Sequence, residues 1–265
     1  MTHGVLLPIG GAEDKTAKRV VLSRFVALCG GTEARIAVIA AASAVPEESG
    51  KRYVDVFSTL GAAQVSVIPI ASRYDADSES ALAQLRAATG IFFTGGDQLK
   101  LVGLIGGTRL HAALRERHAA GMTVAGTSAG ASALSQHMIA FGKSGSTPQQ
   151  RMVQLTAGLG LCAPLIIDQH FRQRDRIGRL LTAVALSPQL IGVGIDEDTA
   201  LLITADGKAE VVGSGSVTIV DGGALSYTDA HAVKGYSVIA LHSVRLHVLT
   251  SGHIYDLNTR LPIAP

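Results

Sequence analysis

Short aliphatic runs alternate with longer amphipathic segments along most of the chain, and this alternation constrains the fold more than any other feature of the sequence. The runs are rich in Val, Ile, Leu and Ala, which is typical of parallel strands buried on both faces. The alternation predicts an α/β fold with a predominantly parallel, flavodoxin-like sheet and helices on both of its faces. The expected strands cover residues 4–9, 35–40, 64–70, 90–94, 122–127, 165–168 and 190–196. The expected helices cover residues 14–29, 47–60, 77–87, 97–105, 108–119, 129–137 and 173–186.

The pattern changes near residue 199, where runs of period two replace the alternation of strands and helices. Asp206-Gly207 and Asp221-Gly222 interrupt these runs, and Asp-Gly pairs are strong signals of hairpin turns. We therefore expect a C-terminal antiparallel β extension, with further strands of unassigned position in the tail 235–265. The segment 142–160 is typical of a loop that enters an irregular turn, and such loops often line sites. No linker or repeat divides the chain, so residues 1–265 are expected to form a single domain.

Charge and cysteine content argue against some classes of function. The formal net charge is +2 over 265 residues, which argues against nucleic acid or a membrane surface as the main partner. Cys29 and Cys162 form neither a CxxC pair nor a disulfide framework, as suits a reducing compartment. The N-terminal segment lacks the cationic and apolar regions of a signal peptide, and no apolar stretch approaches the roughly 20 residues of a membrane span. We expect a cytoplasmic protein.

Motifs that could bind a cofactor or a metal are incomplete. The segment GGAEDK at residues 10–15 follows a strand and opens a helix, but it lacks the third glycine of a dinucleotide fingerprint. It is interpreted as a tight turn, with Asp14 near a helix N-terminus. The nine histidines show no metal-ligand spacing such as HExxH. We expect no metal and no cofactor.

Reactive side chains follow three of the expected strands, and the carboxyl ends of the strands are where an α/β sheet collects its chemistry. Ser128 follows the fifth strand in G-T-S-A-G, where two glycines allow the sharp turn of a nucleophile elbow. His170 follows the sixth strand, and Glu197 follows the seventh, with Asp196 and Asp198 as its competitors. A serine becomes an effective nucleophile when a histidine accepts its proton and a carboxylate orients that histidine. The chain order Ser, His, acid differs from the order in α/β-hydrolases and indicates another family of serine hydrolases.

A fourth strand end could stabilise the oxyanion of such a reaction. The segment FFTGGDQ at residues 92–98 places Gly95 and Gly96 where their backbone N–H groups can face Ser128. Together with the N–H of Ala129 they form a candidate oxyanion hole, in which a donor is worth about 3–4 kcal/mol. The same glycines could equally form a turn that Asp97 caps at the start of the next helix, and the two roles are compatible.

Five segments taken together resemble the cyanophycinases, which are serine peptidases of the S51 type. These segments are GGAEDK, FFTGGDQ, GTSAGA, DQHFRQRDRIGRL and GIDEDTA, and they span residues 10–200 in the order of the family. The TGGD and GTSAGA pieces are shared with the related aspartyl dipeptidases. The pieces that separate the two groups are DQHFRQRDRIGRL and GIDEDTA.

The resemblance implies a fold related to class I glutamine amidotransferases, a homodimer, and an exopeptidase that acts through an acyl-enzyme. Its substrate would be cyanophycin, a poly-aspartate chain with arginine on each side-chain carboxyl, and its product β-Asp-Arg dipeptides. Ser128 then matches the nucleophile, His170 the general base and Glu197 the orienting acid. The residues that match substrate-contacting positions are Gln98, Asp168, Gln169, Arg174, Arg176 and Arg179. The alternatives are an aspartyl dipeptidase for α-linked peptides with the same machinery, and a non-catalytic binding module with an amidotransferase-like fold.

The charged residues beside His170 suit such a substrate. Arg172, Arg174, Arg176 and Arg179 lie within eight residues, and arginine forks match planar carboxylates. Their spacing prevents all four from facing one way, so two or three are expected in the site. Asp168, or another carboxylate near it, is expected to contact the substrate guanidinium.

Overall fold

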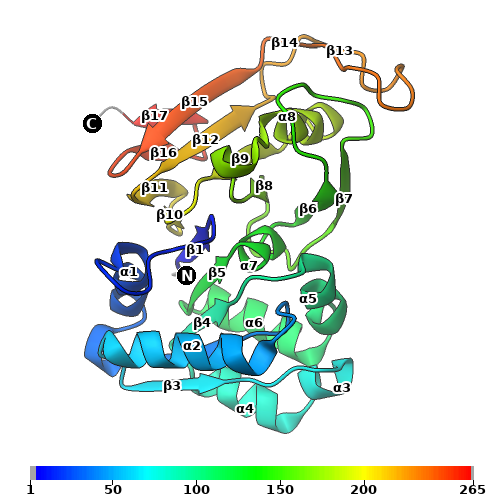
Figure 1. Ribbon diagram of the computed structural model, residues 1–265. Helices are drawn as coiled ribbons and strands as arrows, with labels where there is room; N and C mark the ends of the chain where they lie inside the picture. Colours follow the sequence, from blue (N-terminus) through cyan, green and yellow to red (C-terminus); the bar gives the residue numbers. More distant parts are fainter. Residues whose placement is uncertain (1–3, 264–265) are drawn as a thin grey trace.

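A nine-stranded sheet forms the centre of the molecule in the computed structural model, which describes residues 4–263 (Figure 1). Its strand order is β17-β16-β11-β10-β1-β5-β4-β2-β3, and the five strands at the β3 end are parallel. The parallel strands are β1 (Leu6–Ile9), β5 (Thr123–Thr127), β4 (Gly90–Phe93), β2 (Arg35–Ile39) and β3 (Gln64–Val67). This part of the sheet confirms the α/β prediction and brings the ends of β1, β4 and β5 together at one edge.

Helices cover both faces of the parallel strands, as predicted. On one face, apolar residues of two helices pack with Leu7, Val38 and Phe92. On the other face, residues of four helices pack with Ala37, Ile91 and other strand residues of the opposite pleat. The helices of the first face are α1 (Val20–Leu28) and α2 (Pro46–Thr59). Those of the second face are α4 (Glu79–Ala87), α5 (Gln98–Ile105), α6 (Arg109–Ala119) and α7 (Ala129–Ala133), with the short α3 (Arg73–Ala76) before α4.

The sheet continues in antiparallel strands beyond β1, which confirms the C-terminal extension from residue 199. Strand β10 pairs antiparallel with β1, and β11 follows it through the predicted hairpin at Asp206-Gly207, where Gly207 has a φ of +82°. The tail supplies the last two strands. The strands of this extension are β10 (Thr199–Ile203), β11 (Lys208–Gly213), β16 (Ile254–Asp256) and β17 (Leu261–Ile263).

Two expected strands lie outside this sheet, contrary to the single sheet inferred from the alternation. They are β8 (Leu165–Asp168) and β9 (Ile191–Ile195), which pair parallel with each other in a separate four-stranded sheet of order β15-β12-β9-β8. The antiparallel members are β12 (Ser216–Asp221) and β15 (Arg245–Thr250). The reason is that a strand has only two edges: β1 already pairs with β5 and β10, so it has no free edge for β8 or β9.

The second predicted hairpin, at Asp221-Gly222, is absent. The buried Asp221 carboxylate accepts the Gly223 N–H at 2.8 Å and pairs with Arg260 at 2.9 Å, so the chain leaves β12 instead of folding back on it. It continues to the short pair β13 (Tyr227–Thr228) and β14 (Leu241–His242).

The segment 142–160 is partly a strand, contrary to the expected loop. β6 (His137–Gly142) and β7 (Val153–Ala157) form a two-stranded antiparallel ribbon, and only the residues between them are irregular. The ribbon lies beside the second sheet and α8 (Ile177–Leu186) in Figure 1, near the loop between β13 and β14. This ribbon forms one wall of the site described below.

Three helix boundaries also differ from the expectation. The helix expected at 14–29 begins only at Val20, because the Asp14 carboxylate accepts the N–H groups of Thr16, Ala17 and Arg19 and forms a turn there. The helix expected at 129–137 ends at Ala133, before β6 begins. The one expected at 173–186 is a short 3-10 turn (Arg172–Arg174) followed by α8.

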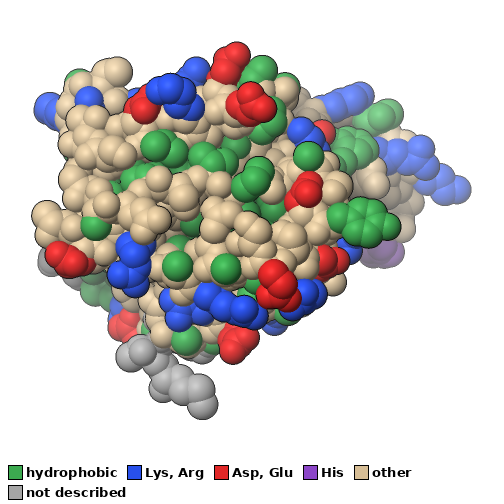
Figure 2. Space-filling model, turned by 90° about the horizontal axis from the view of Figure 1, so that it is seen from below, with side chains coloured by type: hydrophobic (Ala, Val, Ile, Leu, Met, Phe, Trp, Pro, Cys, Tyr) green, Lys and Arg blue, Asp and Glu red, His purple; other side chains and the backbone are tan. Residues whose placement is uncertain are grey.

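The face seen from below, beneath β3 and α4, carries Lys and Arg side chains interspersed with Asp and Glu (Figure 2). Neither sign of charge gathers into one patch on this face. In the described part of the chain, no helix combines the length and the hydropathy needed to cross a membrane.

Candidate active site

Ser128 lies on a strained turn between β5 and α7, as the G-T-S-A-G pattern predicts. Its φ of +52° and ψ of −113° are unfavourable for a residue with a side chain. Both flanking glycines are required, because a Cβ on Gly126 would lie 2.5 Å from the Gly130 backbone, and a Cβ on Gly130 would lie 2.5 Å from the Phe93 carbonyl oxygen. The Ser128 N–H donates to the Ile9 carbonyl at 2.9 Å, which ties the turn to β1.

His170 and Glu197 complete a hydrogen-bonded chain with Ser128. The Ser128 Oγ–H donates to His170 Nε2 at 3.0 Å, and His170 Nδ1 donates to Glu197 Oε1 at 2.6 Å. These residues come from two different sheets, which meet around α7, since one apolar cluster contains residues of both sheets together with Ala129 and Ala131. The geometry is that of a nucleophile, a base and an orienting carboxylate.

The two competitors of Glu197 are occupied elsewhere. The Asp196 carboxylate is buried and accepts from the backbone of Arg172 and from Ser216. Asp198 Oδ1 accepts the Asp14 N–H at 2.8 Å. Glu197 is therefore the carboxylate of this acidic run that contacts the imidazole.

The surroundings of His170 favour its neutral form. Burial lowers the pKa of the imidazole below its ordinary value of 6.5, and the positive charges of Arg174 and Arg176 lower it further, while Glu197 acts in the opposite direction. A neutral imidazole near pH 7 can accept the proton of the serine hydroxyl.

The glycine pair of GGAEDK packs directly against His170, a role that the sequence analysis missed. A Cβ on Gly11 would lie 2.4 Å from His170 Cε1, and the Gly11 φ of +97° also favours glycine. The His170 N–H donates to the Gly10 carbonyl at 2.7 Å, and the Asp198 N–H donates to the Gly11 carbonyl at 2.9 Å. Gly10 and Gly11 therefore pack against His170 and fix the position of its imidazole. The signal in the sequence was a Gly-Gly pair at a strand end, which alone does not tell what it approaches.

Glu13 anchors the same loop beneath the elbow. Its buried carboxylate accepts from the Tyr53 hydroxyl and from Thr127 Oγ1, the residue before Ser128, and pairs with Lys15 at 2.9 Å. Buried charges are stable where they are paired and hydrogen-bonded in this way.

The three candidate oxyanion donors lie beside Ser128. A Cβ on Gly95 would lie 3.3 Å from the Ser128 Cβ, and the N–H groups of Gly95, Gly96 and Ala129 donate no hydrogen bond to another residue between 4 and 263. Asp97 caps α5 by accepting the N–H groups of Leu99 and Lys100. The turn thus caps a helix and leaves backbone donors free beside the nucleophile.

Asp168 is expected to contact the substrate guanidinium, but its side chain is fully buried and lies outside the lining of the cavity beside Ser128 that is described below. Its carboxylate is occupied by other residues. Arg179 donates to both carboxylate oxygens through Nε and Nη2, and Arg176 Nη1 lies 3.4 Å from one of them. In this geometry Asp168 holds the two arginines, and a direct contact between its carboxylate and a substrate guanidinium stays a prediction.

Gln169 connects these arginines to the nucleophile. Its side-chain oxygen accepts from Arg176 Nη1 at 3.0 Å and lies 3.4 Å from Ser128 Oγ. Burial lowers the pKa of Arg176 to about 10, so its guanidinium stays protonated near pH 7.

A cavity of about 410 Å³, called the serine cavity below, opens beside Ser128. Arg174, Arg176 and Arg179 line it, whereas Arg172 points to Asp196 at 3.4 Å. Three of the four arginines are thus in the site. Gln98 also lines it and donates its side-chain amide to the carbonyls of β6. The residues that line the serine cavity are Gly96, Gln98, Ser128, Ala140, Phe141, Gly142, Gln169, Arg174, Arg176 and Arg179.

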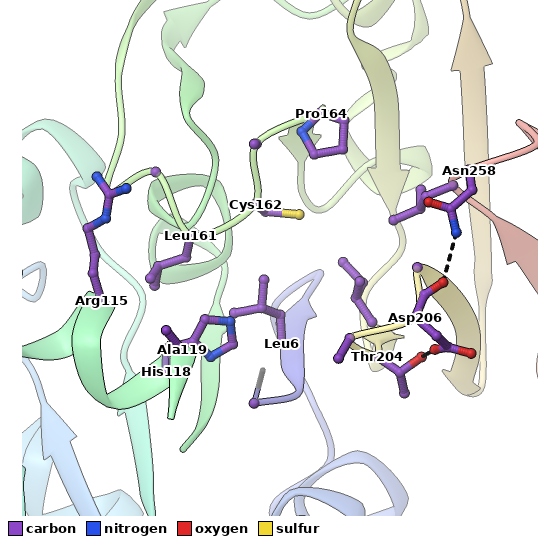
Figure 3. A pocket seen from close by; sticks show the side chains of 17 residues that line it. Leu6, Arg115, His118, Ala119, Leu161, Cys162, Pro164, Thr204, Asp206 and Asn258 are labelled. Carbon is purple, nitrogen blue, oxygen red and sulfur yellow. Dashed lines mark hydrogen bonds between the residues drawn. The ribbon is translucent and has the colours of Figure 1, made fainter. Parts of the chain in front are cut away.

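A larger cavity of about 570 Å³ lies at the amino ends of β1 and β5 and is called the cysteine cavity (Figure 3). Cys162 is its potential nucleophile, but burial raises the pKa of the thiol to about 12, so it is not a thiolate near pH 7. His118 Nδ1 bonds to the Met122 carbonyl, and Asn258 and Thr204 bond to Asp206. Within residues 4–263, no group of three His, Cys, Asp or Glu side chains is placed to hold a metal ion.

The match to a family pattern and the matches to individual proteins point to the same family. The sequence pattern of peptidase family S51 matches residues 5–211. The cyanophycinase of Geminocystis herdmanii is 44% identical over 260 residues, which cover 98% of this chain and 96% of the relative. The cyanophycinase of Trichormus variabilis is 43% identical over 260 residues, covering 98% of this chain and 87% of the relative.

Two solved structures share the fold. The crystal structure of a peptidase from an acI-B1 Actinobacterium has a TM-score of 0.70 at 24% identity and covers 97% of this chain and 98% of its own. A putative peptidase E from Listeria monocytogenes has a TM-score of 0.55 at 19% identity and covers 80% of this chain and 98% of its own.

Proposed function

The chain belongs to peptidase family S51, and on that premise we propose that it is a cyanophycinase, a serine exopeptidase that hydrolyses cyanophycin to β-Asp-Arg dipeptides. The observation that carries the proposal is the hydrogen-bonded chain from Ser128 through His170 to Glu197, which ends at a cavity lined by three arginines. The chemistry of this site matches a substrate whose repeat unit contains a peptide bond, a carboxylate and a guanidinium.

Each residue of the chain has one role in the proposed reaction. Ser128 Oγ attacks the backbone carbonyl of the substrate while His170 Nε2 accepts its proton, and Glu197 stabilises the imidazolium that forms. The backbone N–H groups of Ala129 and of Gly95 or Gly96 donate to the oxyanion. His170 then protonates the leaving amine and activates the water that hydrolyses the acyl-enzyme.

The arginines orient the substrate in this proposal. The guanidinium groups of Arg174, Arg176 and Arg179 bind its carboxylates, since Arg and carboxylate form strong charge-assisted hydrogen bonds. Gln98 and Gln169 contribute the neutral polar contacts.

The proposal is tested by offering cyanophycin and an α-linked Asp dipeptide to the enzyme side by side and measuring the products by mass spectrometry. We expect β-Asp-Arg from the polymer, with a higher kcat/KM than for the dipeptide. Preference for the α-linked dipeptide would contradict the proposal and favour an aspartyl dipeptidase. An enzyme that needs no metal or cofactor keeps its activity after dialysis against EDTA.

The assembly and location are also proposals. We propose one domain, because a single apolar cluster joins residues of both sheets, and a homodimer, because the edge strand β15 exposes Leu246 and Val248. Light scattering at micromolar concentration tests the dimer.

We propose a cytoplasmic location, which agrees with the two free thiols, Cys29 and Cys162. We also propose that the protein binds neither nucleic acid nor a membrane. Fractionation of the cells tests the location.

A further inference from the structure

A second groove adjoins the serine cavity and shares Phe141 and Gly142 with it as common walls. Its volume is about 560 Å³, within the range of roughly 300–1,000 Å³ usual for ligand sites. We call it the ribbon groove, because most of its lining comes from the end of β6, the start of β7 and the residues between them. Its lining residues are Phe141, Gly142, Lys143, Gln150, Arg151, Met152, Val153, Gln154, Leu186 and Tyr236.

Distant parts of the chain build this groove together. The Gln150 N–H donates to the Ser237 carbonyl, and the Ile239 N–H donates to the Pro148 carbonyl, both at 3.0 Å. These bonds fasten the loop between β13 and β14 to the residues between β6 and β7, which lie far apart in the sequence and side by side in Figure 1. Tyr236 is thereby placed opposite the ribbon. The groove is thus held by tertiary contacts.

The groove presents positive charge without a matching carboxylate. Its lining contains Lys143 and Arg151 and no Asp or Glu, and neither cation has an ion-pair partner among residues 4–263. Lys143 Nζ lies 3.8 Å from the centre of the Tyr236 ring, a cation–π contact that holds the ammonium over the groove. Two unpaired cations at one groove favour an anionic ligand group.

The groove also contains an unused acceptor. The side-chain oxygen of Gln150 is buried and has no hydrogen-bond partner in the described part of the chain. Because this oxygen has no solvent access, the Gln150 side chain must turn toward the groove to meet a ligand, and a ligand N–H that donates to it would then satisfy a buried acceptor. The exposed Phe141 ring beside it offers a flat surface on which a guanidinium can stack.

We propose that the ribbon groove is a substrate subsite that binds repeat units of cyanophycin beyond the two that flank the scissile bond. Each unit carries one carboxylate and one guanidinium. Lys143 and Arg151 bind the carboxylate, while Gln150 Oε1 and the Phe141 ring bind the guanidinium. The proposal rests on the proposed function, since it explains how a cyanophycinase would bind a long polymer more tightly than a short substrate. An apolar partner fits this groove poorly, because it would remove two cations from water without pairing them.

The test compares substrates of two lengths with the double variant Lys143→Ala/Arg151→Ala. The shorter is (β-Asp-Arg)₂, which has one scissile backbone bond, and the longer is a soluble oligomer of about ten units. We expect kcat/KM on the oligomer to fall at least about tenfold, mainly through KM, because charge-assisted contacts are lost. Activity on (β-Asp-Arg)₂ should stay within about twofold. Gln150→Leu should also lower kcat/KM selectively on the oligomer, but by a smaller factor.

The matched control is Lys51→Ala/Arg86→Ala, which removes the same charge from exposed positions on α2 and α4. It should leave both substrates unaffected. Equal losses on the two substrates, or no loss on the oligomer, would overturn the subsite. A wild-type enzyme that cleaves neither substrate would instead overturn the proposed function.

Binding gives a readout that does not depend on turnover. Calorimetry compares Ser128→Ala with the triple variant Ser128→Ala/Lys143→Ala/Arg151→Ala, using the ten-unit oligomer as titrant. We expect the triple variant to bind at least about tenfold more weakly, and more so at low salt than at high salt. Equal affinity of the two proteins would contradict the subsite.

Discussion

The serine cavity and the cysteine cavity lie at opposite ends of β1 and β5, and the smaller of the two adjoins the hydrogen-bonded chain of Ser128, His170 and Glu197. Each is lined by a potential nucleophile; His118 lines the cysteine cavity, and His170 contacts Ser128 without lining the serine cavity. In the serine cavity the nucleophile sits on a strained turn within 3.0 Å of a base that a carboxylate orients. In the cysteine cavity the thiol is buried and protonated, and His118 bonds to a backbone carbonyl. The comparison teaches that volume is a poor guide to function and that backbone strain next to a paired base is a better one.

The largest expected effect separates the two nucleophiles. Ser128→Ala should lower kcat on cyanophycin by about 10⁵–10⁶-fold, as expected when a serine nucleophile is removed. Cys162→Ala should leave kcat within about twofold, because its thiol is buried and protonated near pH 7 and lies at the opposite ends of β1 and β5 from Ser128. Steady-state kinetics with both purified variants measure this, with circular dichroism to confirm the fold. A large loss of kcat in folded Cys162→Ala would reverse the comparison.

The next effect concerns the carboxylate that orients the base. Glu197→Gln should lower kcat by about 10³–10⁴-fold, because an amide neither holds the imidazole tautomer nor stabilises the imidazolium. Asp198→Asn is the matched control, since Asp198 bonds to the Asp14 N–H and not to His170. If the two variants lost equal activity, the effect would come from the acidic segment as a whole, and the contact of Glu197 with His170 would not explain it.

A smaller effect tests the loop beneath His170. Gly11→Ala should lower kcat about 100-fold, because the added methyl displaces the imidazole and small displacements of a catalytic group are costly. Gly61→Ala is the control: Gly61 also has a positive φ, +88°, but an added Cβ meets no atom within 4 Å. It shares the backbone strain without the clash, so its kcat should be unchanged. Similar losses of kcat in the two variants would show that strain alone is responsible.

The smallest effect is a shift in the pH profile. The base acts in its neutral form, so kcat/KM should fall as the pH drops through the lowered pKa of His170, with a midpoint below 6.5. Arg174→Gln removes a positive charge that opposes protonation, so the midpoint should move upward. Arg172→Gln, whose side chain pairs with Asp196, should leave the midpoint in place. A downward shift in Arg174→Gln would contradict this account of the site.

The strained turn at Ser128 and its neighbourhood with His170 and Glu197 could be predicted from the sequence. The reason is that they depend on local rules: glycines two residues from Ser128 permit a turn that few other residues allow, and side chains after strands lie at a sheet edge. The helices on both faces and the antiparallel extension follow from periodicity in the same way.

The tertiary structure alone decided which strands share a sheet and what the buried groups contact. Each strand edge pairs once, so the pairing of β10 with β1 left no edge of β1 for β8 or β9, and the sequence of one segment does not show which strand takes that edge. The burial of Asp168 against Arg179 and the approach of Gly11 to His170 likewise join residues distant in the sequence. Local sequence determines which conformations a segment can adopt. Which strands pair and which side chains touch is decided only when all segments pack together, because they compete for the same strand edges and the same space.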